Sequence, residues 1–221
     1  MICLYKWLSY LLVSSSLYTA SQDSSRLLLL ASQELESGFS TSQILTDTSF
    51  IAIHPNKAFR LLIRKYSGAD PLTITGPSEP GEKILVTGYV RDKQAAPIRN
   101  AMVYCYQTDD RGYYAMNQTH VSGNQGDRLH ARLFGYVRTD ANGRFVLHTI
   151  HPRGYPMSSL PSHIHCEVEA SGYNTIITEL LFDEDPRLQG DQRNRSINEG
   201  FLIAKAEHNS YIYLLEMHKD G

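Results

Sequence analysis

Apolar and polar residues alternate in short runs from residue 84 to near the end of the chain. In ILVTGYV, residues 84–90, apolar side chains recur at every second position, as in a strand with one face against a core. FGYVRTDANGRFVLHTI, residues 134–150, has the turn sequence DANG between two such runs, which predicts a hairpin. Further strands are predicted at residues 101–107, 163–170, 175–182 and 209–217. Short strands, close turns and the lack of a long helix predict a mainly β fold, an antiparallel β-sandwich or barrel.

The pattern before residue 70 is different. SSRLLLLASQELESGF and NKAFRLLIRKY space their apolar residues as helices do and contain few β-branched residues. They are followed by ADPLTITGPSEPGEK, residues 69–83, whose prolines and glycines interrupt a helix. We therefore predict a short, partly helical N-terminal extension, residues 22–70, and a β-sandwich domain, residues 71–221.

The first residues, MICLYKWLSYLLVSSSLYTA, have the features of a secretory signal. Lys6 precedes an apolar core, and Ala20 and Ser21 offer small residues at a cleavage point. The apolar run is interrupted by serines and is short for a bilayer, although Tyr18 leaves an uncleaved anchor as the alternative. We expect residues 1–21 to be removed and the protein to be secreted, extracellular or periplasmic, with no membrane association afterwards.

Charge excludes some classes of partner. The chain has 21 Lys and Arg against 23 Asp and Glu, a formal net charge of −2. This balance favours neither a nucleic acid nor an anionic membrane as the main partner. The 14 tyrosines, against 7 phenylalanines, agree with a strand-rich chain.

Two cysteines, Cys105 and Cys166, lie outside the signal segment. They could form one disulfide in an oxidising compartment, but we slightly favour two small apolar core residues on neighbouring strands, because the sequence does not bring their Cα atoms within disulfide distance. Asn117 and Asn194 begin N-x-S/T sequences, and whether they are glycosylated stays open.

The predicted strand HIHCEVE, residues 163–169, presents two imidazoles on one face. Its apolar face carries Ile164, Cys166 and Val168, so His163 and His165 point away from the core. Imidazoles at i and i+2 are one way in which a strand binds a metal, although H-x-H alone is a weak signal and a solvent-facing polar side is the alternative. The turn PRGYP just before this strand could hold Tyr155 over the same face.

The other histidines are weaker candidates. His148 and His151 fall on opposite faces, so we expect His148 to be exposed and His151 to lie in a loop. His120 and His130 lie in a polar segment, and we expect both to be exposed to solvent.

Three segments in order resemble the intradiol ring-cleavage dioxygenases, the catechol and protocatechuate 3,4-dioxygenase type. They are ILVTGYVRDKQAAPIRNAMVYCYQTDDRGYY, GYVRTDANGRFVLHTIHPRGYP and PSHIHCEVEASGYNTIITELLFDEDP, which together span roughly residues 72–190. The family fold is an antiparallel β-sandwich, which agrees with the strand pattern.

The resemblance implies a site for one Fe(III) ion, held by two tyrosines and two histidines. The positions that match are Tyr114, Tyr155, His163 and His165, with Tyr113 as the competing choice for the first tyrosine. Phenolate is a hard anionic donor that favours Fe(III). A tyrosine of ordinary pKa near 10 is ionised at neutral pH only beside a strongly charged cation.

The resemblance also implies an activity. Members use O2 to open a catechol ring to a muconate-type diacid, with Tyr155 as the iron ligand that the substrate displaces and Tyr114 as one that stays bound. The expected partners are a small aromatic diol and O2, and a homo-oligomer is possible. The alternative is a secreted iron- or catechol-binding β-sandwich with little or no ring cleavage.

Two positions depart from the family pattern. Leu160 stands where members carry an arginine that stabilises charge on the ring, and Glu179 stands where they commonly carry glutamine. Loss of such a cation costs transition-state stabilisation, and we consider Arg132, Arg138 and Arg153 as replacements. The loop between Tyr155 and His163 is also short, so the substrate wall must be built differently.

Overall fold

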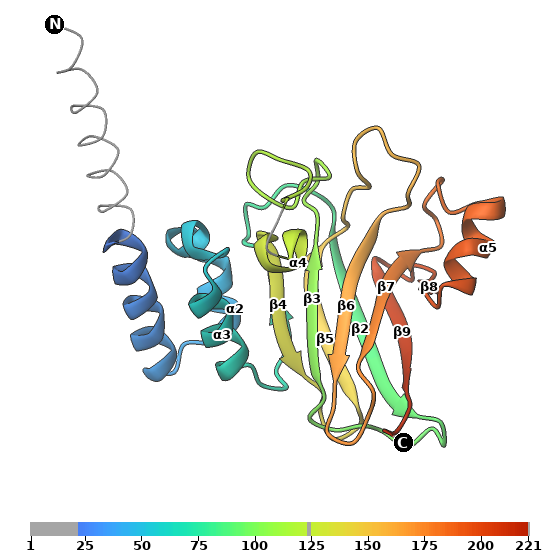
Figure 1. Ribbon diagram of the computed structural model, residues 1–221, viewed down its shortest axis with the longest axis horizontal. Coiled ribbons are helices and arrows are strands. Elements are labelled where there is room, and N and C mark those ends of the chain that lie inside the picture. Colours follow the sequence, from blue (N-terminus) through green and yellow to red (C-terminus); the bar gives the residue numbers. More distant parts are fainter. Residues whose placement is uncertain (1–21, 123–124, 221) are drawn as a thin grey trace, which may run out of the picture.

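The structure, a computed structural model, describes residues 22–122 and 125–220. The predicted signal segment, residues 1–21, lies outside the described residues. Helices occupy most of residues 22–66, and strands dominate from residue 72 (Figure 1).

The strands form two sheets that lie one in front of the other (Figure 1). The four-stranded sheet has the order β1-β5-β2-β9, made of β1 Leu72–Thr73, β5 Arg144–Ile150, β2 Lys83–Asp92 and β9 Ser210–Met217. The five-stranded sheet has the order β4-β3-β6-β7-β8, made of β4 Leu133–Arg138, β3 Met102–Gln107, β6 His163–Glu169, β7 Ile176–Phe182 and β8 Leu202–Ala204. Apolar side chains of both sheets meet in one core, among them Val86, Phe145, Val103 and Ile164.

The prediction of a purely antiparallel arrangement is wrong. Strand β1 runs parallel to β5, β9 parallel to β2, and β8 parallel to β7. Parallel neighbours need a long connection rather than a tight turn, and β2 and β9 are separated by more than one hundred residues. Alternation along one strand indicates which face is buried but carries no information about the direction of its neighbour.

Cys105 on β3 and Cys166 on β6 lie directly opposite each other in the five-stranded sheet. Both are buried and both are free thiols. The interpretation of these cysteines as core residues on neighbouring strands is therefore confirmed.

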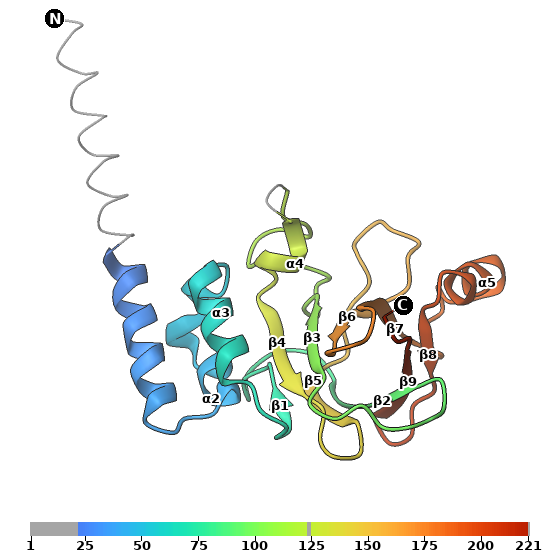
Figure 2. The same cartoon turned by 60° about the horizontal axis from the view of Figure 1, so that its bottom comes forward.

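The N-terminal helices lie at one side of the sheets, next to β4 (Figure 2). They comprise residues 22–36, α2 Thr41–Thr46, the 3-10 helix η1 Thr48–Ile53 and α3 Lys57–Tyr66. Asn56 caps α3 by accepting hydrogen bonds from the amides of Ala58 and Phe59. Arg60 attaches this helix to the sheet region, since it is buried and donates to the carbonyls of His54 and Ala131.

Two helices, α4 Gly126–His130 and α5 Gly190–Asn198, lie within the strand-rich half. The sequence GDQRNRSIN of α5 is polar and buries only Ser196, so it has no hydrophobic periodicity to detect. Among the described residues, no helix has both the length and the apolar character that crossing a membrane requires.

Candidate metal centre

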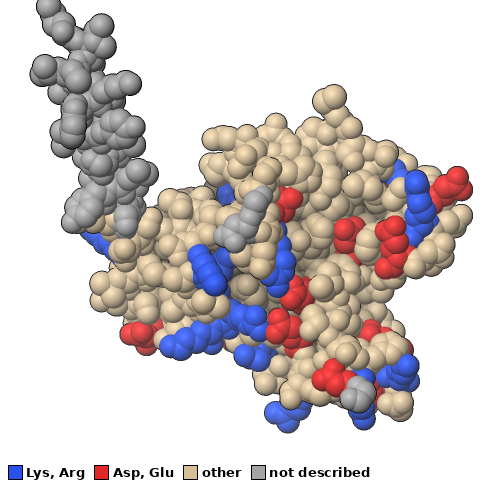
Figure 3. Space-filling model, viewed as in Figure 1, with Lys and Arg blue, Asp and Glu red and all other residues tan. Residues whose placement is uncertain are grey.

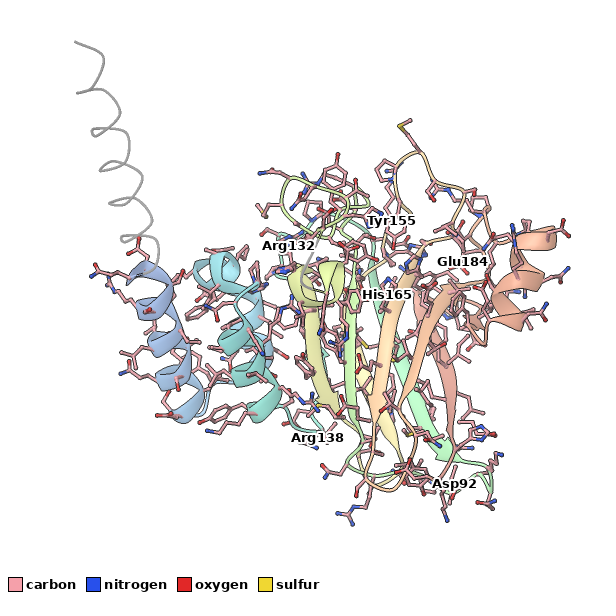
Figure 4. The ribbon with its side chains drawn as sticks, in the orientation of Figure 1. Asp92, Arg132, Arg138, Tyr155, His165 and Glu184 are labelled. Carbon is pink, nitrogen blue, oxygen red and sulfur yellow. The ribbon has the colours of Figure 1, made fainter. Side chains whose placement is uncertain are left out.

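The centre lies at one end of the five-stranded sheet, where β6 begins. Figure 4 shows Tyr155 and His165 close together at this end, whereas Arg138 lies at the opposite end. His163 and His165 come from β6, and Tyr155 comes from the segment between β5 and β6. The predicted alternation of β6 is confirmed, because Ile164, Cys166 and Val168 are all buried in the core.

Tyr114 reaches the same point from the segment that follows β3. Asp109 shapes this segment by accepting hydrogen bonds from the amides of Arg111 and Tyr113. Gly112 has a φ of +84°, and a Cβ there would lie 2.7 Å from the carbonyl oxygen of Gly154. The turn that carries Tyr114 therefore packs tightly against the turn that carries Tyr155, and glycine is needed at the contact.

The four side chains converge through their polar tips. The Tyr114 hydroxyl lies 2.6 Å from the Tyr155 hydroxyl and 2.8 Å from His165 Nε2. The Tyr155 hydroxyl lies 2.9 Å from His163 Nε2, and the two Nε2 atoms are 3.2 Å apart. Two oxygens and two nitrogens from three separate segments thus surround one point. Tyr113, the competing choice, instead packs its ring against the Arg111 guanidinium, 4.8 Å away.

The ring orientation of His163 is fixed by a backbone contact. Its Nδ1 lies 2.8 Å from the carbonyl oxygen of Pro161, which can only accept, so Nδ1 carries the proton. Nε2 is then left with a free lone pair directed at the centre. A histidine that binds a metal is commonly oriented by such a hydrogen bond from its other nitrogen.

Glu179 lies on β7 directly opposite His165 and offers a different set of potential ligands. One potential ligand atom from each of three residues, His163, His165 and Glu179, lies within 4.8 Å of the other two. However, the Glu179 carboxylate lies beside the Nδ1 atoms, 3.6 Å from that of His165 and 3.9 Å from that of His163. It therefore faces the side of the imidazoles away from the tyrosines and is too far from both Nδ1 atoms for a direct hydrogen bond.

Burial favours the uncharged forms of Tyr114, Tyr155 and His165. Desolvation raises the pKa of Tyr114 and of Tyr155 well above the usual range. Desolvation, with the neighbouring His163, lowers the pKa of His165 to about 3. The pKa of Glu179 is raised by burial, against the opposing effect of His163. Only a strongly charged cation would offset the cost of ionising two buried phenols.

His120 is a residue of this site that the sequence pattern did not indicate. Its ring packs edge-on against Tyr155, with centroids 4.4 Å apart, and lies 5.8 Å from Tyr114. His120 Nδ1 lies 2.7 Å from the Asp127 carboxylate, which also accepts from the amide of Val121. The expectation that His120 is exposed to solvent is confirmed, since its side chain is 52% exposed, and its ring contacts with Tyr155 and Tyr114 also place it beside the centre.

The other candidates lie outside the centre. His148 is exposed on β5, and His151 lies in a loop with its ring 4.2 Å from that of Phe182, as expected for both. The carboxylate of Glu79 accepts two hydrogen bonds from Arg132, each 2.6 Å long. Arg138 bonds to Asn100 near the far end of the sheet.

Arg187 is the guanidinium that lies against the segment between Tyr155 and β6. Its Nη1 lies 3.4 Å from the carbonyl oxygen of Leu160. A Cβ on Gly154 would lie 2.0 Å from the same Nη1 atom of Arg187. The sequence did not single out Arg187, because it follows β7 and reaches this segment only in the folded chain.

Comparison with known proteins agrees with this arrangement. A family model described as "Dioxygenase" matches residues 64–213. The hydroxyquinol 1,2-dioxygenase of Rhizobium sp. (strain MTP-10005) is 27% identical over 161 residues, which cover 58% of this chain and 52% of that protein. The protocatechuate 3,4-dioxygenase beta chain of Burkholderia cepacia is 33% identical over 119 residues, 50% of this chain and 49% of that protein. The chain therefore spans about half the length of these relatives.

Solved structures share the fold. Catechol 1,2-dioxygenase from Acinetobacter sp. ADP1 superposes with a TM-score of 0.55 at 19% identity, covering 69% of this chain and 58% of that one. 3-Chlorocatechol 1,2-dioxygenase from Rhodococcus opacus 1CP gives a TM-score of 0.52 at 24% identity, covering 70% and 65%.

Proposed function

The chain belongs to the intradiol ring-cleavage dioxygenase family, and we propose that it opens a catechol-type ring with O2 at an Fe(III) centre. The observation that carries this proposal is the convergence of Tyr114, Tyr155, His163 and His165. Two phenols and two imidazoles are a donor set that suits Fe(III), because the ionised phenols are hard and anionic.

When bound, Fe(III) draws electron density from a coordinated catecholate, so that the ring becomes reactive toward O2. The residues of the chain hold the substrate and move its protons. Tyr155 lies on a turn and is more exposed than Tyr114, which is 1% exposed. This agrees with the family resemblance, which implies that the substrate would displace Tyr155 from a bound Fe(III), and the Tyr155 phenolate oxygen would then take the proton from a substrate hydroxyl. Tyr114, His163 and His165 stay in position.

Arg187 takes over the role of the cation that the family pattern places at position 160. Its guanidinium bonds to the backbone of Leu160 and lies over Gly154, the residue before Tyr155. No ion pair of Arg187 is found among the described residues, so its charge is available to oppose negative charge that develops on the ring.

Secretion belongs to the same proposal. The motivating feature is the signal-like sequence of residues 1–21, with Lys6 before an apolar core. N-terminal sequencing of protein expressed from the full chain tests it: a mature chain beginning near residue 21 or 22 supports export, and an intact Met1 contradicts it.

The second candidate function is an iron- or catechol-binding protein that does not cleave the ring. It is favoured by Leu160 and Glu179, which replace the residue types that the family resemblance implies. In this case the four donors hold the ion and a catechol, but the environment fails to stabilise the reacting ring.

Oxygen consumption with catechol separates the two functions. The iron-loaded protein is mixed with catechol in air-saturated buffer, and O2 uptake and muconate absorbance are followed together. Uptake with muconate formation supports the enzyme, and a visible spectral shift without O2 uptake supports the binding protein. If the protein shows neither O2 uptake nor a spectral shift, both candidate functions are overturned. Tyr113→Phe is the matched control, since Tyr113 lies outside the centre and its loss leaves the response unchanged.

A further inference from the structure

A cavity of about 310 Å³ adjoins the metal centre on the side away from the N-terminal helices. Leu160, Pro161 and His163 form one wall, Glu179 of β7 contributes a second, and helix α5 closes the third. Figure 1 shows α5 beyond β7 and β8, at the edge of the five-stranded sheet. The cavity borders the centre through His163, and Tyr114, Tyr155 and His165 do not line it, so it could take only a substituent of a ligand bound at the centre and not its ring.

Ser196 of α5 borders this cavity and has an unsatisfied hydroxyl. The residue is 1% exposed, and its Oγ is buried without a hydrogen-bond partner among the described residues. Leaving a buried hydroxyl unpaired costs free energy, and such a group is rare unless it serves a ligand or a water. The unpaired hydroxyl is an observation independent of the cavity itself.

The remaining lining is polar and carries both signs of charge. Carboxylates come from Glu179 and Glu199, and the one guanidinium, that of Arg195, already donates to Gln192 Oε1 at 2.9 Å. Figure 3 likewise shows acidic and basic side chains intermixed on the face around α5. Two carboxylates and one guanidinium line the cavity, and Arg187 adds a second guanidinium against the Leu160 backbone, so the charges nearly balance and favour an uncharged substituent. A hydroxyl can donate to the carboxylates and accept from Ser196 or Gln192.

We infer that this cavity is a substituent subsite, and that the substrate is an uncharged catechol carrying a hydroxyl-bearing side chain. The inference rests on the proposed function and adds the substrate class to it. Helix α5 thereby builds the substrate wall that the short segment between Tyr155 and His163 leaves open. Ser196 is the specificity-determining residue, and it binds the side-chain hydroxyl.

Three catechols of similar size test this inference by binding rather than turnover. They are 4-(2-hydroxyethyl)catechol, 4-ethylcatechol, which lacks the hydroxyl, and 3,4-dihydroxyphenylacetate, which carries a carboxylate. Dissociation constants are measured by calorimetry on the iron-loaded protein without O2. The hydroxyethyl compound should bind about three- to tenfold more tightly than the ethyl compound, the range expected for one neutral hydrogen bond, and the carboxylate should bind most weakly.

Ser196→Ala removes the unpaired hydroxyl without creating a large void, so the variant should fold at least as stably as the parent. It should weaken binding of the hydroxyethyl compound about three- to tenfold and leave the ethyl compound unchanged. Asn198→Ala is the matched control, because Asn198 is exposed on the same helix and does not line the cavity.

The outcomes separate the subsite from the proposed function. Equal binding of the hydroxyethyl and ethyl compounds, or an unchanged preference in Ser196→Ala, overturns the subsite while the proposed function stands. Tighter binding of the carboxylate than of the hydroxyethyl compound also overturns it. Failure of all three catechols to bind contradicts the proposed function as well.

Discussion

Tyr114 and Tyr155 carry the main electrostatic cost of the centre. Burial raises the pKa of both phenols, and the two hydroxyls lie 2.6 Å apart, so two phenolates here would repel each other strongly. A trivalent cation removes both obstacles at once. Metal binding then releases protons, and affinity for the metal should fall as the pH falls.

The identity of the ligands is tested by two substitutions. If the phenols bind the ion and Glu179 does not, Tyr155→Phe should remove a tyrosinate ligand and much of the visible absorbance. Glu179→Gln should keep both the absorbance and the bound iron, because glutamine is the residue type that the family resemblance implies at this position. Absorbance and bound iron are measured on both variants. Complete loss of iron in Glu179→Gln, with normal iron in Tyr155→Phe, would assign the site to the His163, His165 and Glu179 set instead.

Residue by residue, the sequence indicated part of this site. Alternation in HIHCEVE was enough to direct His163 and His165 away from the core. Tyr114 is 51 residues from His165, so it entered only through the family resemblance. His120 and Arg187 could not be predicted, because their contacts with Tyr155 and Leu160 depend on how separate loops pack.

Among the elements, β6 was the easiest to predict, since it pairs a buried apolar face with a face of histidines and glutamates. Helix α5 was missed because its burial is limited to Ser196. The 3-10 helix η1 was missed too, and the residue that follows it, His54, is a buried histidine. His54 is 2% exposed and donates from Nδ1 to the carbonyl of Arg132 at 2.7 Å.

His54 should make the stability of the protein depend on pH. Burial, with smaller effects of Arg60 and Arg132, lowers the pKa of His54 to about 4, against about 6.5 in an unfolded chain. Between these values the unfolded chain binds more protons, so stability falls as the pH falls below about 6.5. Between pH 7.5 and 5 the loss from this residue is about 2 kcal/mol, measured as the change in unfolding free energy in urea.

His54→Gln should reduce this pH dependence, because glutamine can donate to the Arg132 carbonyl and does not titrate. The measurement uses metal-free protein, so that ligand protonation is not confused with metal release. His148→Gln is the control, since His148 is exposed on β5 and its loss should leave the pH dependence unchanged. An equal slope in His54→Gln and the parent would contradict this assignment.

For the whole molecule, the sequence correctly predicted strands in the second half of the chain but not the directions in which they pair. Two facing sheets follow from the alternating runs, whereas the parallel pairs β2 with β9 and β7 with β8 arise from long connections. How the N-terminal helices attach was also unpredictable, because it depends on Arg60, a residue type that is rarely buried. Its guanidinium lies 3.7 Å above the Phe134 ring and donates to Tyr104 at 2.8 Å.

Arg60 should therefore stabilise the whole chain. Arg60→Leu would leave the carbonyls of His54 and Ala131 without this donor, and we expect a loss of about 2 to 4 kcal/mol in unfolding free energy. Arg64→Leu is the matched control on the same helix. Its ion pair with Glu169 is about 40% exposed and should contribute less than about 1 kcal/mol. Similar losses in the two variants would argue against a special role of Arg60.

The visible spectrum of the purified protein, read together with its iron content, tests the central claim most directly. If Tyr114, Tyr155, His163 and His165 hold Fe(III), the protein is wine-red from tyrosinate-to-iron charge transfer and contains about one iron per chain. His163→Ala and His165→Ala should each lose the colour, and His148→Ala should keep it. A parent protein that stays colourless and free of iron, even after reconstitution with iron, would contradict the account.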